Sequence, residues 1–229
     1  MSRAQPRLDT AGSPEGDDPV RQRILGAAFK TFTAKGYAGT STLEIATRAK
    51  VSKRDLYANF DTKEAVLVAC IKSRTARMQL RPELPTPRSR RELRSILNVY
   101  AATLLRQVSH PTVVAMFRLA IAEAKRSPEI AQALETAGRD ATRRTLTDLF
   151  EGAQAASLIA AGGASEMAAQ YLALLWEGLM VSMLLGLAPA PTPEEIERRT
   201  TKATTAFLQL HPEPRTPKQA DFPRNSTAA

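Results

Sequence analysis

Three pairs of residues, spaced about ten residues apart, have the sequence signature of helix N-termini. Each pair joins an acceptor side chain with an acid three residues later: Ser41 with Glu44, Ser52 with Asp55, and Asp61 with Glu64. The first side chain can accept hydrogen bonds from free backbone N–H groups, and the acid can accept one from the N-cap residue. One such pair is weak evidence. Three in succession predict three helix starts, near residues 42, 53 and 62.

The interval between the first two of these helices is typical of a helix-turn-helix. The predicted helices, roughly Thr42–Ala49 and Lys53–Phe60, leave only a short turn between them. An earlier helix is expected to begin at Pro19, with Asp18 as N-cap, and to end at Gly36. Its Phe29 and Phe32 face should pack against a small core made of Ile45, Ala46, Ala49, Val51, Leu56 and Phe60.

The charge of the chain is concentrated near this motif. The whole chain has 32 Lys and Arg against 23 Asp and Glu, which gives a net charge of +9. Between residues 19 and 80 there are twelve basic residues and four acidic ones. A polyanion, either nucleic acid or a membrane surface, is therefore the expected partner. The outward residues of the third helix are donors able to meet bases and phosphates: Lys53, Arg54, Tyr57 and Asn59, with Asp55 among them.

The order and spacing of residues 20–70 resemble the DNA-binding domain of TetR-family regulators. The resemblance is carried by Ile24-Leu25, Ala27-Ala28, Phe32, Gly36-Tyr37, Thr40-Ser41-Thr42, Ile45-Ala46, Val51-Ser52-Lys53, Leu56-Tyr57, Phe60 and Lys63-Glu64. It implies that Thr42, Tyr57 and Lys63 contact DNA phosphates. It also implies that Ser52, Lys53, Arg54 and Asn59 lie at the major groove of double-stranded operator DNA.

Two positions depart from the family pattern, and three have a structural alternative. Lys50 stands where the family usually has Gly, which costs about 1 kcal/mol if its φ is positive. Arg54-Asp55 replaces a common Gly and small polar residue, so base preference cannot be transferred from relatives. Tyr57 could instead be a core aromatic and Lys63 a surface lysine. Asp55 is expected to be a cap, because phosphates repel an acid.

The rest of the chain predicts a larger helical domain. Residues 81–91 contain three prolines and should form a connector. Together with this connector, residues 81–211 are expected to form a helical domain for ligand binding and dimerisation. The segment Arg118-Leu119-x-Ile121-x-Glu123-Ala124-x-x-x-Pro128-Glu129 resembles the AefR-like type of TetR C-terminal domain. Residues 1–18 and 212–229 are expected to be a disordered arm and tail, so the predicted domains are 19–80 and 81–211.

The last two predicted helices suggest a homodimer. One helix from Met167 to Leu187 is apolar nearly all round, and a monomer of this size could bury only one face comfortably. Thr192 should cap the final helix, whose inward residues are Ile196, Ala203, Phe207 and Leu210. The two helices could form half of a four-helix dimer bundle. The alternative is a central helix buried within a monomer.

Polar or aromatic groups within apolar helices are the candidates for orienting a small-molecule effector. They are Tyr100, Met116, Phe117, Arg118 and Trp176. The sequence thus predicts an all-α regulator, expected to be a repressor, that binds palindromic operator DNA as a homodimer and releases it when a ligand binds. The alternative is a DNA-binding or adaptor protein that senses no ligand and whose C-terminal domain is only a dimer scaffold.

Other function classes are disfavoured by what the sequence lacks. It has two histidines, no phosphate-binding glycine loop and no HExxH pattern, so neither an enzyme nor a cofactor or metal is expected. A single cysteine, Cys70, excludes an internal disulfide and a CxxC zinc site. Tyr171–Ala190 is long enough to span a membrane, but Glu177 lies near its middle, so neither a membrane span nor a membrane partner is expected. With no apolar stretch typical of a signal peptide near Met1, a cytoplasmic protein is expected.

Overall fold

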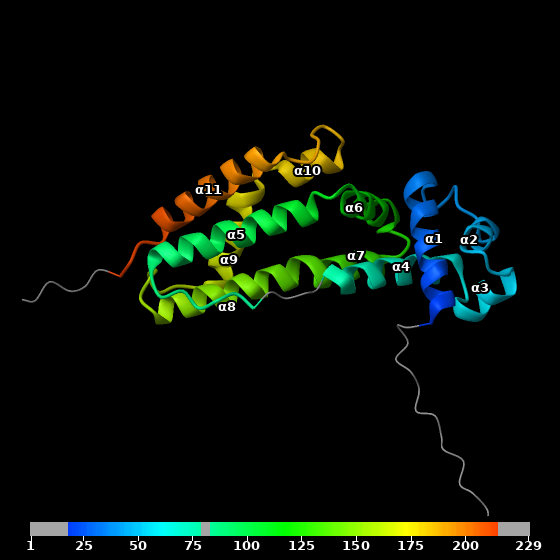
Figure 1. The fold of residues 1–229 in the computed structure, drawn as a ribbon, viewed down its shortest axis with the longest axis horizontal. Coiled ribbons are helices and arrows are strands. Elements are labelled where there is room, and N and C mark those ends of the chain that lie inside the picture. Colours follow the sequence, from blue (N-terminus) through cyan, green and yellow to red (C-terminus); the bar gives the residue numbers. More distant parts are fainter. Residues whose placement is uncertain (1–17, 79–82, 215–229) are drawn as a thin grey trace, which may run out of the picture. The chain divides into compact units, whose positions relative to one another are not determined.

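The computed structural model describes residues 18–78 and 83–214, and within them the fold is entirely helical. The N-terminal helices are α1 (Pro19–Lys35), α2 (Thr42–Ala49), α3 (Lys53–Asn59) and α4 (Lys63–Met78). They are followed by α5 (Arg90–Val108), α6 (Pro111–Glu123), α7 (Pro128–Leu134), the π-helical segment η1 (Glu135–Asp140), α8 (Ala141–Ala155), α9 (Ala164–Trp176), α10 (Leu179–Leu184) and α11 (Pro193–Leu210). The all-α prediction is confirmed (Figure 1).

The chain forms two compact units that are not continuous in sequence. Unit 1 contains residues up to Gln79 together with Ala115–Gly138, and unit 2 contains Leu80–Val114 and the residues from Arg139 onward. The segment that returns to unit 1 packs through α7 against α4. A division along the sequence near residue 80 therefore does not describe the packing of residues 115–138.

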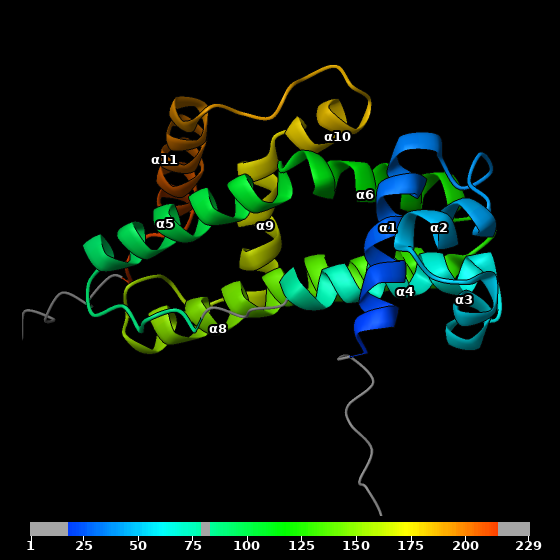
Figure 2. The same cartoon turned by 45° about the vertical axis from the view of Figure 1, so that its right-hand side comes forward.

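In unit 1, α1 packs against α2, α3 and α4 around one small core (Figure 2). Phe29 and Phe32 are buried as predicted. The buried residues from the other helices include Ile45, Ala46, Ala49, Leu56, Phe60, Val66, Leu67 and Ile71. Val51 is only half-buried. Cys70 is a buried free thiol that donates to the Leu25 carbonyl at 3.2 Å, and burial raises its pKa to about 12.

Two of the three predicted caps are present, and the third lies one residue later than expected. The Ser41 hydroxyl accepts from the Glu44 amide, and Ser52 and Asp55 form a complete capping box. At α4 the cap is Thr62, not Asp61, because the Thr62 hydroxyl accepts from the Ala65 amide at 3.0 Å. Thr62 and Asp61 are both N-cap residue types, so the sequence pattern alone does not separate them.

In unit 2, three aromatic rings form the centre of the core. Phe150 from α8 stacks on Phe207 from α11 at a centroid distance of 4.5 Å, and Tyr171 from α9 contacts both rings edge-on. The Tyr171 hydroxyl donates to the Leu97 carbonyl at 3.1 Å and lies 3.0 Å from the Thr204 hydroxyl. This network fixes α9 to both α5 and α11.

The predicted single helix from Met167 to Leu187 is wrong, because it breaks between α9 and α10. Glu177 has φ of 38° and Gly178 has φ of 78°, so two consecutive residues are left-handed. Glycine adopts this conformation easily, whereas glutamate does so at a cost. Leu210, expected to face inward from α11, is 63 % exposed because α11 ends there.

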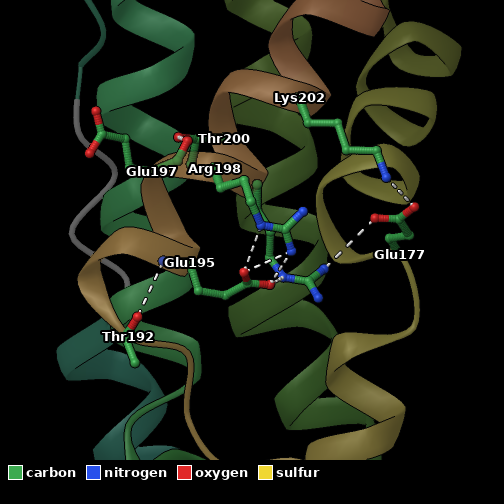
Figure 3. Close-up of polar contacts among 8 residues, drawn as sticks. Glu177, Thr192, Glu195, Glu197, Arg198, Thr200 and Lys202 are labelled. Atoms are coloured by element: carbon green, nitrogen blue, oxygen red, sulfur yellow. Dashed lines mark hydrogen bonds and ion pairs between the residues drawn. The ribbon is translucent and has the colours of Figure 1, made fainter.

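Ion pairs surround this break (Figure 3). Lys202 Nζ lies 2.6 Å from Glu177 Oε1, and Arg199 Nη1 lies 4.0 Å from Glu177 Oε2. Glu195 pairs with both Arg198 and Arg199 on α11. The hydrogen bond and charge of Lys202 lower the pKa of Glu177. Glu177, which the sequence places in the middle of an apolar segment, is therefore an exposed carboxylate that connects the break to α11.

No helix in the described part of the chain combines the length and apolar character needed to cross a membrane.

Candidate nucleic-acid interface

The N-terminus of α3 is held by reciprocal hydrogen bonds between Ser52 and Asp55. The Ser52 hydroxyl accepts from the Asp55 amide at 3.0 Å and donates to Asp55 Oδ2 at 2.7 Å, and the Ser52 amide donates to the same oxygen at 3.1 Å. These bonds lower the pKa of Asp55. Asp55 is thus a cap, as expected, and the Ser52 proton is already committed to it.

Two hydroxyl groups connect α2 to α3 at the surface. Thr42 Oγ1 and the Tyr57 hydroxyl lie 3.2 Å apart. Tyr57 is 42 % exposed, so the alternative in which it is a core aromatic is excluded. Lys53 Nζ lies 5.8 Å from the centre of the Tyr57 ring. The two predicted phosphate ligands and one predicted groove residue therefore form a single surface cluster, named the Thr42–Tyr57 face below.

Arg54 lies on the first turn of α3 and is exposed. No hydrogen bond or ion pair to another described residue engages its guanidinium. An arginine with five free donors can contact a guanine edge or a phosphate without first losing a contact within the protein.

Asn59 and Arg21 determine how α3 ends. Asn59 Nδ2 donates to the Asp55 carbonyl at 2.9 Å, so its amide is turned back onto its own helix. Arg21 from α1 donates to the Asn59 carbonyl at 3.2 Å and lies 4.4 Å from the centre of the Phe60 ring. Sequence reasoning missed this role of Arg21, because the contact joins residues 38 positions apart.

Lys63 braces the loop between α1 and α2. Its ammonium group donates to the carbonyls of Tyr37 and Thr40, each at 2.9 Å, and lies 4.2 Å from the centre of the Tyr37 ring. An ammonium group has three donors, so one remains for a phosphate. Neither sequence expectation, a phosphate ligand or a plain surface lysine, included this structural role.

Lys50 ends α2 in the left-handed conformation that the sequence made questionable. Its φ and ψ are 55° and 48°, and its amide donates to the Ala46 and Thr47 carbonyls. The residue accepts the cost of a Cβ where glycine would have none.

A contact within unit 1 joins the start of α4 to the start of α7. The Ser127 hydroxyl donates to Glu64, and Ser127 makes no side-chain cap on its own helix. The neighbouring Tyr37 has a raised pKa, chiefly through burial and then through the charges of Glu64 and Glu123.

The five predicted ligand residues differ widely in exposure. Tyr100 and Met116 are buried, Phe117 and Trp176 are half-buried, and Arg118 is exposed. Tyr100 and Trp176 belong to unit 2, whereas the other three belong to unit 1. A hollow of about 520 Å³ in unit 2 contains none of the five and is lined by residues 83–87 with Thr145, Asp148, Leu149 and Gly152.

Two family models match this chain. Residues 24–70 match the model of bacterial regulatory proteins of the tetR family, and residues 95–211 match that of the AefR-like transcriptional repressor C-terminal domain. An uncharacterized HTH-type transcriptional regulator of Bacillus subtilis, YvkB, is 40 % identical over 53 residues. That match spans 23 % of this chain and only 28 % of YvkB.

Solved structures extend the similarity to nearly the whole chain. A TetR transcriptional regulator from Agrobacterium tumefaciens is 27 % identical, with a TM-score of 0.75 over 85 % of this chain and 94 % of that one. The flavonoid-responsive regulator FrrA is 30 % identical, with a TM-score of 0.67 over 86 % of this chain and 98 % of that one. These relatives are regulators and not enzymes, in agreement with the sequence expectation. The chain therefore belongs to the TetR family of transcriptional regulators.

Proposed function

We propose that this protein is a cytoplasmic repressor that binds a palindromic operator as a homodimer and leaves it when a small aromatic molecule binds. The observation that supports DNA binding most strongly is the Thr42–Tyr57 face. It joins the Thr42 hydroxyl of α2 to the Tyr57 hydroxyl and Lys53 of α3, and the exposed Arg54 follows Lys53 in sequence. Helix α3 is capped at its start, and Arg21 donates a hydrogen bond to its last carbonyl. Phosphate contacts would set the position, and Arg54 would contact base edges.

The site residues contribute in different ways to this proposal. Thr42 and Tyr57 bind one phosphate through their paired hydroxyls, and Lys63 binds another with its remaining donor. Lys53 and Arg54 enter the major groove. Ser52 and Asn59 contact DNA less directly than the sequence suggested, because the Ser52 hydroxyl proton and one of the two Asn59 amide protons are engaged with Asp55.

A homodimer is supported by the apolar surface near the break between α9 and α10. Val181, Leu185 and Leu187 are between 60 % and 78 % exposed in the single chain. Exposed apolar residues this close in sequence are typical of a surface that another chain covers. Two subunits would place two α3 helices at half-sites about 34 Å, or a small multiple of that, apart.

Ligand response is supported by two observations. FrrA, which is 30 % identical, is described as flavonoid-responsive. The Ser127–Glu64 hydrogen bond gives α7 a direct contact with α4, the helix that follows the helix-turn-helix. A ligand that favours a different position of α4 weakens DNA binding. By thermodynamic linkage, DNA weakens the binding of that ligand by the same factor. Tyr100 and Trp176 of unit 2 are proposed as ligand contacts, and Met116, Phe117 and Arg118 of unit 1 are separate candidates for that role.

The proposal is tested by fluorescence anisotropy with the duplexes that lie upstream of the protein's own gene. Specific binding should fall steeply with salt, since each neutralised phosphate releases counterions. A panel of flavonoids is then titrated into the complex. Release supports a ligand-responsive regulator. A flavonoid that binds the protein, as measured by calorimetry, without changing DNA affinity supports the alternative of a dimer scaffold.

Two further measurements test assembly and DNA binding separately. Light scattering at micromolar concentration should give twice the mass of the 24.9 kDa chain, and a monomer would exclude the homodimer. Equal affinity for every duplex tested, whatever its sequence, would exclude an operator-specific regulator.

A further inference from the structure

Leu43 is an exposed apolar side chain beside the Thr42–Tyr57 face. It is 62 % exposed, and among the described side chains of α1 to α4 the only other large hydrophobic side chain classed as exposed is Tyr57. A single exposed leucine needs no explanation by itself. The position of Leu43 does need an explanation, because Leu43 directly follows Thr42, whose hydroxyl is hydrogen-bonded to that of Tyr57 on the proposed DNA-binding face.

The contacts of α2 show which side of the helix Leu43 occupies. Ile45, Ala46 and Ala49 are buried in the core, and Glu44 turns toward α1, where its carboxylate lies 2.6 Å from Lys35 Nζ. Leu43, Thr47 and Lys50 are exposed and follow one another at positions i, i+4 and i+7, so they share one face. That face is neither the core face nor the flank that contacts α1.

Leu43 is the one large apolar side chain among the three residues of this face. The Thr47 hydroxyl donates to the Leu43 carbonyl at 2.9 Å and is thereby turned onto its own helix. The surrounding surface is strongly basic, with Arg48, Lys50, Lys53 and Arg54 close in sequence. A basic surface with one apolar side chain suits nucleic acid better than an apolar protein partner.

We propose that Leu43 is a specificity-determining residue that packs against the C5-methyl group of a thymine in each operator half-site. The inference rests on the proposed function, because it requires α2 and α3 to lie at the major groove. There the C5-methyl is the one apolar group at a base edge, and it distinguishes thymine from cytosine. A branched aliphatic side chain is complementary to it and offers nothing to a hydrogen-bonding edge.

The experiment removes the same contact from either side. The wild-type operator is first obtained by selection from random duplexes. Each thymine of one half-site is then replaced by deoxyuridine, which lacks only the methyl group, and affinity is measured by anisotropy. At one position this change should weaken wild-type binding about 4-fold, the equivalent of burying one methyl group. Leu43→Ala should weaken binding to the thymine operator and abolish the difference between thymine and uracil at that position.

The control is Val99→Ala, which truncates an equally exposed apolar residue on α5. It should keep both the affinity and the uracil effect, and all variants should show unchanged thermal unfolding. Leu43 has no such role if no position responds to uracil, or if Leu43→Ala keeps the full response. A wild type that selects no sequence at all would instead refute the proposed function, which distinguishes the two failures.

Discussion

The hydroxyl groups of Thr42 and Tyr57 lie 3.2 Å apart and join the start of α2 to the middle of α3 at the protein surface. One proton lies between the two oxygens, and the second proton is free to be donated outward. The pair can therefore present one oriented donor to a phosphate while it fixes the angle between the two helices.

Tyr57→Phe tests this pairing because it removes one hydroxyl and keeps the ring. Operator affinity should fall about 3- to 10-fold, the range for one neutral hydrogen bond, while stability stays unchanged at this exposed site. Thr42→Val should have a similar effect. If the two hydroxyls act as one ligand, anisotropy measurements on the double variant will show less than the product of the two losses. Full additivity would mean independent contacts.

Lys50→Gly should stabilise the protein by about 0.5 to 1 kcal/mol, because glycine adopts the left-handed conformation of this residue without cost. Thermal denaturation measures the effect. Lys50→Ala is the matched control, since it loses the same charge but keeps the Cβ. The two variants should differ in stability and bind DNA equally. Equal stability would mean that the backbone here carries no strain.

Lys63→Met should destabilise unit 1 by about 1.5 to 3 kcal/mol, because two backbone carbonyls lose a charged donor. Urea denaturation gives this value. Lys30→Met on the exposed side of α1 controls for the loss of a surface charge. A Lys63→Met protein with normal stability and weakened DNA binding would show that the lysine is a phosphate ligand only.

The buried Cys70 thiol predicts a loss of stability at alkaline pH. Burial raises its pKa in the folded state from about 9 to about 12, so the unfolded chain releases this proton more readily. The contribution is complete below pH 9 and is lost as the pH rises toward 12. Cys70→Ala should therefore show a shallower decline in unfolding free energy over pH 9–11 than the wild type. Identical slopes would contradict the raised pKa.

Local signals in the sequence predict unit 1 better than unit 2. The Ser41 and Ser52 caps and Gly36 are short-range signals, and helices α1 to α3 begin and end within a residue of the predicted positions. The break at Glu177-Gly178 interrupts an apolar run whose periodicity continues through it, so only the glycine gave a signal. The roles of Arg21 and Lys63 depend on partners 23 to 38 residues away, and periodicity contains no information about such contacts.

Selection of bound sequences from a random duplex pool tests the central claim, that α3 recognises an operator through Arg54. The wild type, Arg54→Ala and Arg144→Ala are compared, and Arg144, an exposed arginine on α8, controls for the loss of charge. We predict one palindromic sequence for the wild type and Arg144→Ala, and the loss of base preference at one position of each half-site for Arg54→Ala. An identical sequence from all three proteins, or none from any, would contradict the account.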